Sequence, residues 1–148
     1  FVMVLNKREE FLDLYKTIIS NSLRNVKIIP HVPFDEIETV FSKASLFLST
    51  AKYEGMPNTF LQAAKYELPI VSLTVDPNNM ITLHKSGVHC KDSVNVMIDT
   101  IQELSKSESQ RLEYGKNCLD YLEKNHGYKE IGTKLKMYLL DMAKKIRK

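Results

Sequence analysis

Segment 49–62 contains the residues best suited to bind an anionic ligand. Gly55 allows a tight turn, or a close approach of the backbone to a ligand. Pro57 is favoured as the first residue of a helix, where the first amide groups have no intrahelical acceptors. Those amides and the helix dipole attract anions. A diphosphate could therefore be bound here without a divalent metal, and the sequence has no Asp-x-Asp pair or histidine cluster to hold one.

Glu54 and Gln62 are the side chains of this segment that suit hydroxyl groups. A carboxylate at Glu54, just before the helix start, would accept hydrogen bonds from sugar hydroxyls near a phosphate. Gln62 lies roughly 7–8 Å along the helix axis from Pro57, at about 1.5 Å per residue. This is about the reach from a diphosphate to the ribose of the same nucleotide, and an amide can bond one or two ribose hydroxyls. A solvated carboxylate and a surface glutamine are the plainer alternatives.

Two further polar features follow predicted strands. His31 could line a base pocket, although a loop histidine without a ligand is the commoner case. The Asp-Pro-Asn-Asn cluster at 76–79 is typical of a turn or a helix start. It also follows a strand end, where contacts to a donor sugar could lie.

Short apolar strands alternate with amphipathic helices, which indicates an α/β fold with a parallel sheet in one domain. Strands are predicted at 1–5, 26–29, 46–49, 69–73 and 88–90. Helices are predicted at 9–23, 35–43, 57–66 and 78–86, the last ended by Gly87, and segment 93–148 is predicted to be helical in three pieces. Because ligands bind beyond the carboxyl ends of parallel strands, we expect the site in the segments that follow them, at 6–8, 30–34, 50–57 and 74–79.

The composition is that of a globular protein, with 43% hydrophobic and 26% charged residues in a chain of 148. The net charge of +3 is uneven, because segment 128–148 has seven Lys or Arg and two Asp or Glu, a balance of +5. No nucleic-acid-binding motif accompanies these charges, so nucleic acid is not expected as a partner. The basic end at 143–148 is either a solvated helix end or a peripheral contact with an anionic membrane. Two cysteines without metal or redox spacing favour a cytoplasmic location, in which that contact would be at the inner face of the membrane.

Segment 53–62 resembles the acidic motif of family 4 glycosyltransferases, in which a Glu, seven residues and a second Glu follow one another. Segments 25–33, 41–49 and 68–72 are similar to the strands and loops around that motif, so the resemblance covers about 1–125. It implies the C-terminal half of a GT-B fold, a Rossmann-like parallel sheet with helices on both faces, without its first strand and helix. Residues 1–148 would then be a single nucleotide-sugar-binding domain of a two-domain enzyme. An apolar run at the start, without an initiator Met, also leads us to expect a longer natural protein.

The resemblance also implies an activity. The family transfers a sugar from a nucleotide diphosphate, such as a UDP- or GDP-sugar, with retention of configuration and without a metal or cofactor. A glycan or lipid-linked acceptor, as in polysaccharide biosynthesis, would be bound by a missing N-terminal domain. Glu54 would be the catalytic residue, in contact with hydroxyls of the donor sugar. The donor-binding residues would be Gly55, Met56 and Pro57 in the phosphate loop, Asn58 and Thr59 through their amides, and Gln62 at the ribose, with His31 in the loop that lines the base pocket.

Three departures from the family pattern leave other functions open. Gln62 replaces the second Glu, as a subfamily variant or with weaker ribose binding, and Glu67 replaces a Gly that usually precedes Leu-Pro. The segment that normally supplies an Arg and a Lys to the diphosphate is missing. A nucleotide-sugar epimerase on the same fold would need catalytic acids and histidines that are not evident. A non-catalytic Rossmann-like binding module is supported by Gln62 and Glu67.

Overall fold

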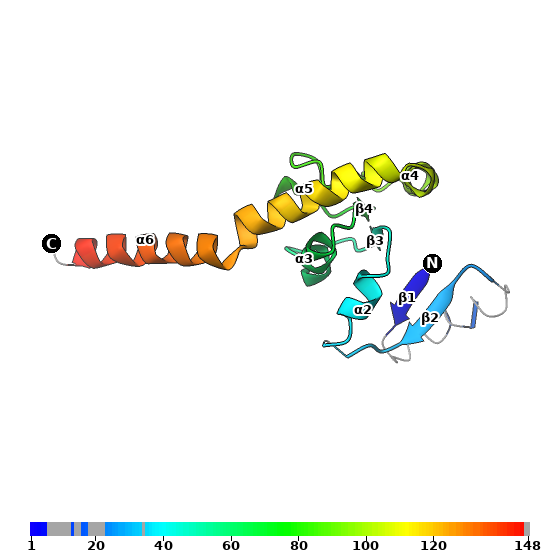
Figure 1. Ribbon diagram of the computed structural model, residues 1–148, viewed down its shortest axis with the longest axis horizontal. Helices are drawn as coiled ribbons and strands as arrows, with labels where there is room; N and C mark the ends of the chain where they lie inside the picture. The colour runs from blue at the N-terminus through cyan, green and yellow to red at the C-terminus, as the bar shows by residue number, and fades with distance from the viewer. Residues whose placement is uncertain (6–12, 14–15, 18–22, 34, 147–148) are drawn as a thin grey trace. The chain divides into compact units, whose positions relative to one another are not determined.

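The computed structural model describes residues 1–5, 13, 16–17, 23–33 and 35–146, which belong to two compact units, Phe1–Val40 and Phe41–Lys148 (Figure 1). The described strands form one parallel sheet in each unit. In the first unit, β1 (Val2–Leu5) pairs with β2 (Lys27–Pro30), with Met3 opposite Ile28. Both strands were predicted to within one residue. Most of the helix predicted at 9–23 lies outside the described residues.

The second unit has a three-stranded sheet in the order β3-β4-β5, comprising Phe47–Ser49, Ile70–Ser72 and Gly87–His89. Leu48 lies opposite Val71, which lies opposite Val88. Helix α3 (Asn58–Lys65) connects β3 to β4, which is the crossover that a parallel pair requires. The strands after 40 were also predicted correctly, and all of β4 is buried, as expected of a central strand.

Side chains alternate between the two faces of this sheet, and helices cover both. On one face, Phe47 packs edge-on against Phe60 of α3, with ring centroids 5.8 Å apart. On the other, Val71 packs in a core cluster with Met97 and Leu104 of α4 (Val94–Lys106). The chain therefore has the predicted α/β, Rossmann-like architecture.

The C-terminal segment contains α4, α5 (Glu108–His126) and α6 (Tyr128–Ile146), the three predicted helical pieces. Serine side chains define the first two starts. Ser93 Oγ accepts from the Val96 amide at 3.3 Å, and Ser107 Oγ accepts from the Gln110 amide at 3.4 Å. None of the helices in the described part of the chain combines the length and apolar character of a membrane-spanning segment.

Two predicted helices differ in the structure. Helix α2 covers only Glu38–Phe41, because the residues before it form turns in which the amides of 36 and 37 both donate to Pro33 O. The helix predicted at 78–86 is wrong, since only a 3₁₀ turn, η2 (Pro77–Asn79), is present. Asn78 and Asn79 have φ values of 52° and 55°, and these left-handed conformations end the helix at once.

Gly87 does not end a helix but begins β5, and only glycine fits there. Its φ is 149°, and an added Cβ would overlap the carbonyl oxygen of Ile70 on β4. The absence of a Cβ at Gly87 thus allows β4 and β5 to pair in the observed register. The beginning of β5 depends on this close approach.

Glu67 lies in a turn that normally requires glycine. The Glu67 amide donates to Ala64 O at 3.1 Å and the Leu68 amide to Ala63 O at 3.0 Å, which is the Schellman pattern at the end of α3. The residue after the C-cap then adopts a left-handed conformation, and Glu67 has a φ of 51°. Glu67 is therefore a strained residue at the end of α3.

Candidate functional site

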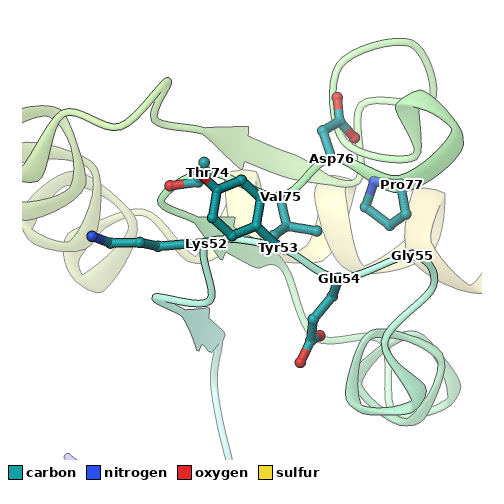
Figure 2. A pocket seen from close by; sticks show the side chains of 8 residues that line it. All are labelled: Lys52, Tyr53, Glu54, Gly55, Thr74, Val75, Asp76 and Pro77. Atoms are coloured by element: carbon teal, nitrogen blue, oxygen red, sulfur yellow. The ribbon is translucent and has the colours of Figure 1, made fainter.

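A cavity of about 550 Å³ lies beyond the carboxyl ends of β3 and β4 (Figure 2). Its walls are the loop after β3 and the loop after β4, the place where parallel sheets bind ligands. The lining residues are Lys52, Tyr53, Glu54, Gly55, Thr74, Val75, Asp76 and Pro77. Two of the four segments predicted from strand ends therefore meet at one site.

The loop after β3 leaves its side chains exposed. Lys52, Tyr53 and Glu54 are all exposed, Tyr53 by 92%. Around Gly55, a Cβ would meet no described atom within 4 Å, and its φ is not in the left-handed region. The backbone conformation of Gly55 therefore does not require glycine, and a side chain at this position would meet open space.

The start of α3 follows directly from this loop. Pro57 was expected as the first helical residue, but its ψ of 128° is extended, so it is the N-cap and the helix begins at Asn58. Among the described residues, no side chain caps this start. Pro57 is buried, whereas Asn58 and Thr59, the residues that carry the first helical amides, are exposed. These amides can donate hydrogen bonds to an anion, and the helix dipole favours negative charge at this position.

Hydrogen bonds from the end of β5 fix the loop after β4. His89 Nε2 donates to Thr74 O at 2.8 Å, and the Asp92 amide donates to Leu73 O at 2.7 Å. Thr74 Oγ1 in turn lies 3.3 Å from a carboxylate oxygen of Asp92. The end of β5 therefore fixes the backbone of the cavity wall that the loop after β4 forms.

The Asp76 carboxylate accepts hydrogen bonds from the turn that follows it in the sequence. It accepts from the amides of Ile81 at 2.7 Å and Thr82 at 3.2 Å, and from the Thr82 hydroxyl at 2.6 Å. These bonds satisfy the backbone that follows η2, so the Asp76 side chain has a structural role. Glu54 is the cavity carboxylate that remains exposed to solvent.

The structure brings together only some of the residues singled out from sequence. Glu54 and Gly55 line the cavity, and Asn58 and Thr59 lie at the helix start just after it. Met56 is half-buried in the connecting loop. Gln62 is half-buried one turn along α3 and is not among the lining residues.

His31 belongs to the other unit, where it is exposed and has a φ of 29°. Thr74 and Val75 were not singled out individually, although their position directly after a predicted strand was a signal for them. Within the described ranges, no three His, Cys, Asp or Glu side chains gather as metal ligands.

The model of the family "Glycosyl transferases group 1" matches residues 6–107, more than half of the chain and all of both cavity loops. The chain belongs to this family. No curated protein matches it in a sequence search. Solved structures of glycosyltransferases share its fold, and the chain spans about a third or less of their length.

Two of these structures are GT-B glycosyltransferases. A mutant of TarM from S. aureus, in complex with Fondaparinux, α-GlcNAc-glycerol and UDP, is 22% identical, with a TM-score of 0.73 over 91% of this chain and 28% of that chain. WaaG, a glycosyltransferase involved in lipopolysaccharide biosynthesis, is 18% identical, with a TM-score of 0.66 over 86% of this chain and 34% of that chain. At these identities the likeness shows the fold of the glycosyltransferase domain alone.

Proposed function

We propose that this domain binds the nucleotide-sugar donor of a retaining glycosyltransferase, and that it does so without a metal. The observation that carries the proposal is the cavity at the ends of β3 and β4, with an exposed carboxylate, Glu54, next to an uncapped helix start. Its volume of about 550 Å³ is within the usual range for small-molecule sites. Membership of the glycosyltransferase family supports the same conclusion.

The donor would be divided between the two parts of the site. The diphosphate would accept hydrogen bonds from the amides of Asn58 and Thr59, where the helix dipole favours negative charge. The sugar would occupy the cavity, with Glu54 accepting bonds from its hydroxyls. Such bonds to a charged group are worth about 1.5–3 kcal/mol each. Gln62, one turn further along α3, would contact the ribose.

Transfer would require a second part of the enzyme that binds the glycan or lipid-linked acceptor. The chain spans about a third or less of the GT-B structures that it resembles, so the acceptor site is expected outside it. The isolated domain should then bind nucleotide weakly and transfer nothing.

A titration of the 148-residue chain, followed by amide NMR shifts, tests donor binding. UDP, GDP and ADP are each added to millimolar levels, with and without EDTA. For at least one of them, saturable shifts are expected at Gly55, Asn58 and Thr59, unchanged by EDTA. The proposal fails if none of them shifts these amides, and metal independence fails if EDTA abolishes the shifts.

Glu54→Ala separates the sugar subsite from the phosphate subsite. The nucleotide that binds the wild type should bind the Glu54→Ala variant with the same affinity. The corresponding nucleotide sugar should lose about tenfold or more of the affinity that it gains over the nucleotide in the wild type, the equivalent of one hydrogen bond to a charged group. Gln62→Ala should instead weaken the binding of the nucleotide and of the nucleotide sugar to the same extent. Equal binding of the nucleotide sugar to both proteins would remove Glu54 from the site.

Analysis of products made by the longer enzyme distinguishes the alternatives. A glycoside with the anomeric configuration of the donor is the expected product, with turnover strongly reduced by Glu54→Ala. An epimerised nucleotide sugar would support an epimerase. The absence of both transfer and donor hydrolysis would support a non-catalytic module.

A further inference from the structure

Tyr53 is the aromatic residue among those that line the cavity, and the fold makes almost no use of its ring. The residue is 92% exposed. Within the described part of the chain, the ring stacks on no other ring and the hydroxyl has no hydrogen-bond partner. Val75 and Pro77, which line the same cavity, are buried. Tyr53 therefore presents an open apolar surface to a ligand that enters the cavity.

Other tyrosines of the second unit show how the fold uses such a ring in packing. Tyr66 stacks on Phe41 with ring centroids 6.4 Å apart. Tyr121 is only 4% exposed and lies against His84, with ring centroids 4.8 Å apart. Small-molecule sites, by contrast, are lined largely by hydrophobic and aromatic side chains that a ligand can reach. Tyr53 is therefore placed as a ligand contact and not as a packing residue.

The neighbour of Tyr53 is Glu54, the carboxylate proposed to bind hydroxyls of the donor sugar. Consecutive Cα atoms lie only about 3.8 Å apart, and both residues line the same cavity. In Figure 2 the ring and the carboxylate leave the loop in different directions, so they offer contacts at two separate points. A pyranose has two matching surfaces, because its hydroxyls are polar whereas the C–H bonds on each face of its ring are apolar.

We propose that Tyr53 stacks on the apolar face of the sugar ring of the donor while Glu54 binds its hydroxyls, an inference that rests on the proposed donor site. The negative face of an aromatic ring attracts weakly positive C–H hydrogens, and stacking removes apolar surface of both partners from water. Glucose and N-acetylglucosamine, whose ring substituents are mostly equatorial, have uninterrupted C–H faces. Tyr53 thus favours donors that carry a pyranose of this kind.

Stacking of Tyr53 on the base of the nucleotide is less well supported. The diphosphate separates the base from the sugar, and its proposed place is at the amides of Asn58 and Thr59. Tyr53 and Glu54 precede this helix start and line the cavity, whereas Gln62, proposed to contact the ribose, lies beyond it and outside the lining. Tyr53 is therefore grouped with the carboxylate that binds the sugar and not with the ribose contact.

Amide NMR titrations of the 148-residue chain with paired ligands test the proposal. UDP is compared with UDP-glucose and UDP-N-acetylglucosamine, GDP with GDP-glucose, and ADP with ADP-glucose. Tyr53→Ala should leave the affinity for the nucleotide unchanged and should lower the affinity for the nucleotide sugar by about fivefold or more. Tyr53→Phe keeps the ring and should bind both ligands like the wild type. Tyr128→Ala is the matched control, because Tyr128 is 97% exposed but lies on α6, outside the lining of the cavity.

The proton signals of the bound sugar give a direct signature of stacking. The ring current of an aromatic side chain shifts protons above its face upfield. The C–H protons on one face of the sugar should therefore move upfield in the wild type and in Tyr53→Phe, but not in Tyr53→Ala at the same saturation. A merely structural role for Tyr53 would change the affinity without this shift. Circular dichroism verifies that each variant remains folded.

Three results would overturn the proposal. They are equal affinities of the wild type and Tyr53→Ala for every nucleotide sugar, an upfield shift of the base protons in place of the sugar protons, and a loss of affinity in Tyr53→Ala that Tyr53→Phe shares. Saturable nucleotide binding with any of these results would leave the proposed donor site intact. The absence of nucleotide binding would instead overturn the donor site and this inference together.

Discussion

The loops after β3 and β4 line the same cavity but are held in different ways. In the loop after β4, Thr74 is held by His89 and Asp92, and Asp76 accepts three hydrogen bonds from the turn that follows. In the loop after β3, the Ala51 amide lies 3.4 Å from Ser49 Oγ, and the next three side chains are exposed. We infer that the loop after β4 is a structural scaffold, and that the loop after β3 supplies the groups that contact the ligand. Carboxylates of the same chemistry, Asp76 and Glu54, would therefore have opposite roles.

Gly87→Ala is expected to have the largest effect, because it displaces the strand that holds the loop after β4. The new Cβ would overlap Ile70 O in a backbone with a φ of 149°. The free energy of unfolding should fall by at least about 3 kcal/mol. Urea denaturation measures this change. Gly132→Ala is the control, since open space surrounds Gly132, and similar losses in both variants would contradict the explanation.

Asp76→Ala and Glu54→Ala test the comparison most directly. Asp76→Ala removes an acceptor from three donors and should lower the free energy of unfolding by roughly 2 kcal/mol. Glu54→Ala should change it by less than about 0.5 kcal/mol, since the side chain is exposed. Urea denaturation of the two variants under the same conditions gives both values. Equal losses would mean that Glu54 is also part of the scaffold.

The scaffold side also contains a buried titratable group. Cys118 Sγ lies 3.1 Å from Leu68 O and 3.0 Å from Ser86 O, just before β4 and β5. Burial raises the pKa of this thiol from 9.0 to about 12. Between these values the unfolded chain releases a proton that the folded chain retains, so stability falls as the pH rises above about 9.

The wild type should therefore lose about 1.4 kcal/mol at pH 10 through this group. Cys118→Ser does not titrate, so its free energy of unfolding should fall by about that much less between pH 7 and pH 10. Parallel pH dependences for the two proteins would show that Cys118 does not carry the effect.

The strands and the cavity loops could be predicted because their signals are local. Short apolar runs defined β1 to β5, and the rule for strand ends located the loops at 50–57 and 74–79. The helix predicted at 78–86 failed because left-handed Asn78 and Asn79, with the Asp76 carboxylate, form a turn that overrides apolar spacing. The role of Gly87 could not be predicted either, since it depends on Ile70 in another strand. Whether Gln62 and His31 contact a ligand stays a prediction.

Glu67→Gly should stabilise the scaffold. Glu67 has a φ of 51° in a turn that glycine adopts without strain. Relief of this strain should raise the free energy of unfolding by about 1 kcal/mol, less the entropy that glycine adds to the unfolded chain. Thermal unfolding measures the change, and Glu67→Ala, which keeps the Cβ, should not reproduce it. Equal melting temperatures for wild type and Glu67→Gly would show that the turn is not strained.

Gly55→Ala should have the smallest effect on stability and a specific effect on binding. Because a Cβ there meets no described atom within 4 Å, the free energy of unfolding should change by less than about 0.5 kcal/mol. Because Gly55 lines the cavity, an added methyl group should take up space that a ligand would fill, and nucleotide-sugar affinity should fall by about tenfold. Amide NMR titration and urea denaturation of the same sample measure both quantities. If Gly55→Ala lost stability but kept the affinity for the nucleotide sugar, the loop after β3 would be a structural scaffold like the loop after β4, and not the part of the site that contacts the ligand.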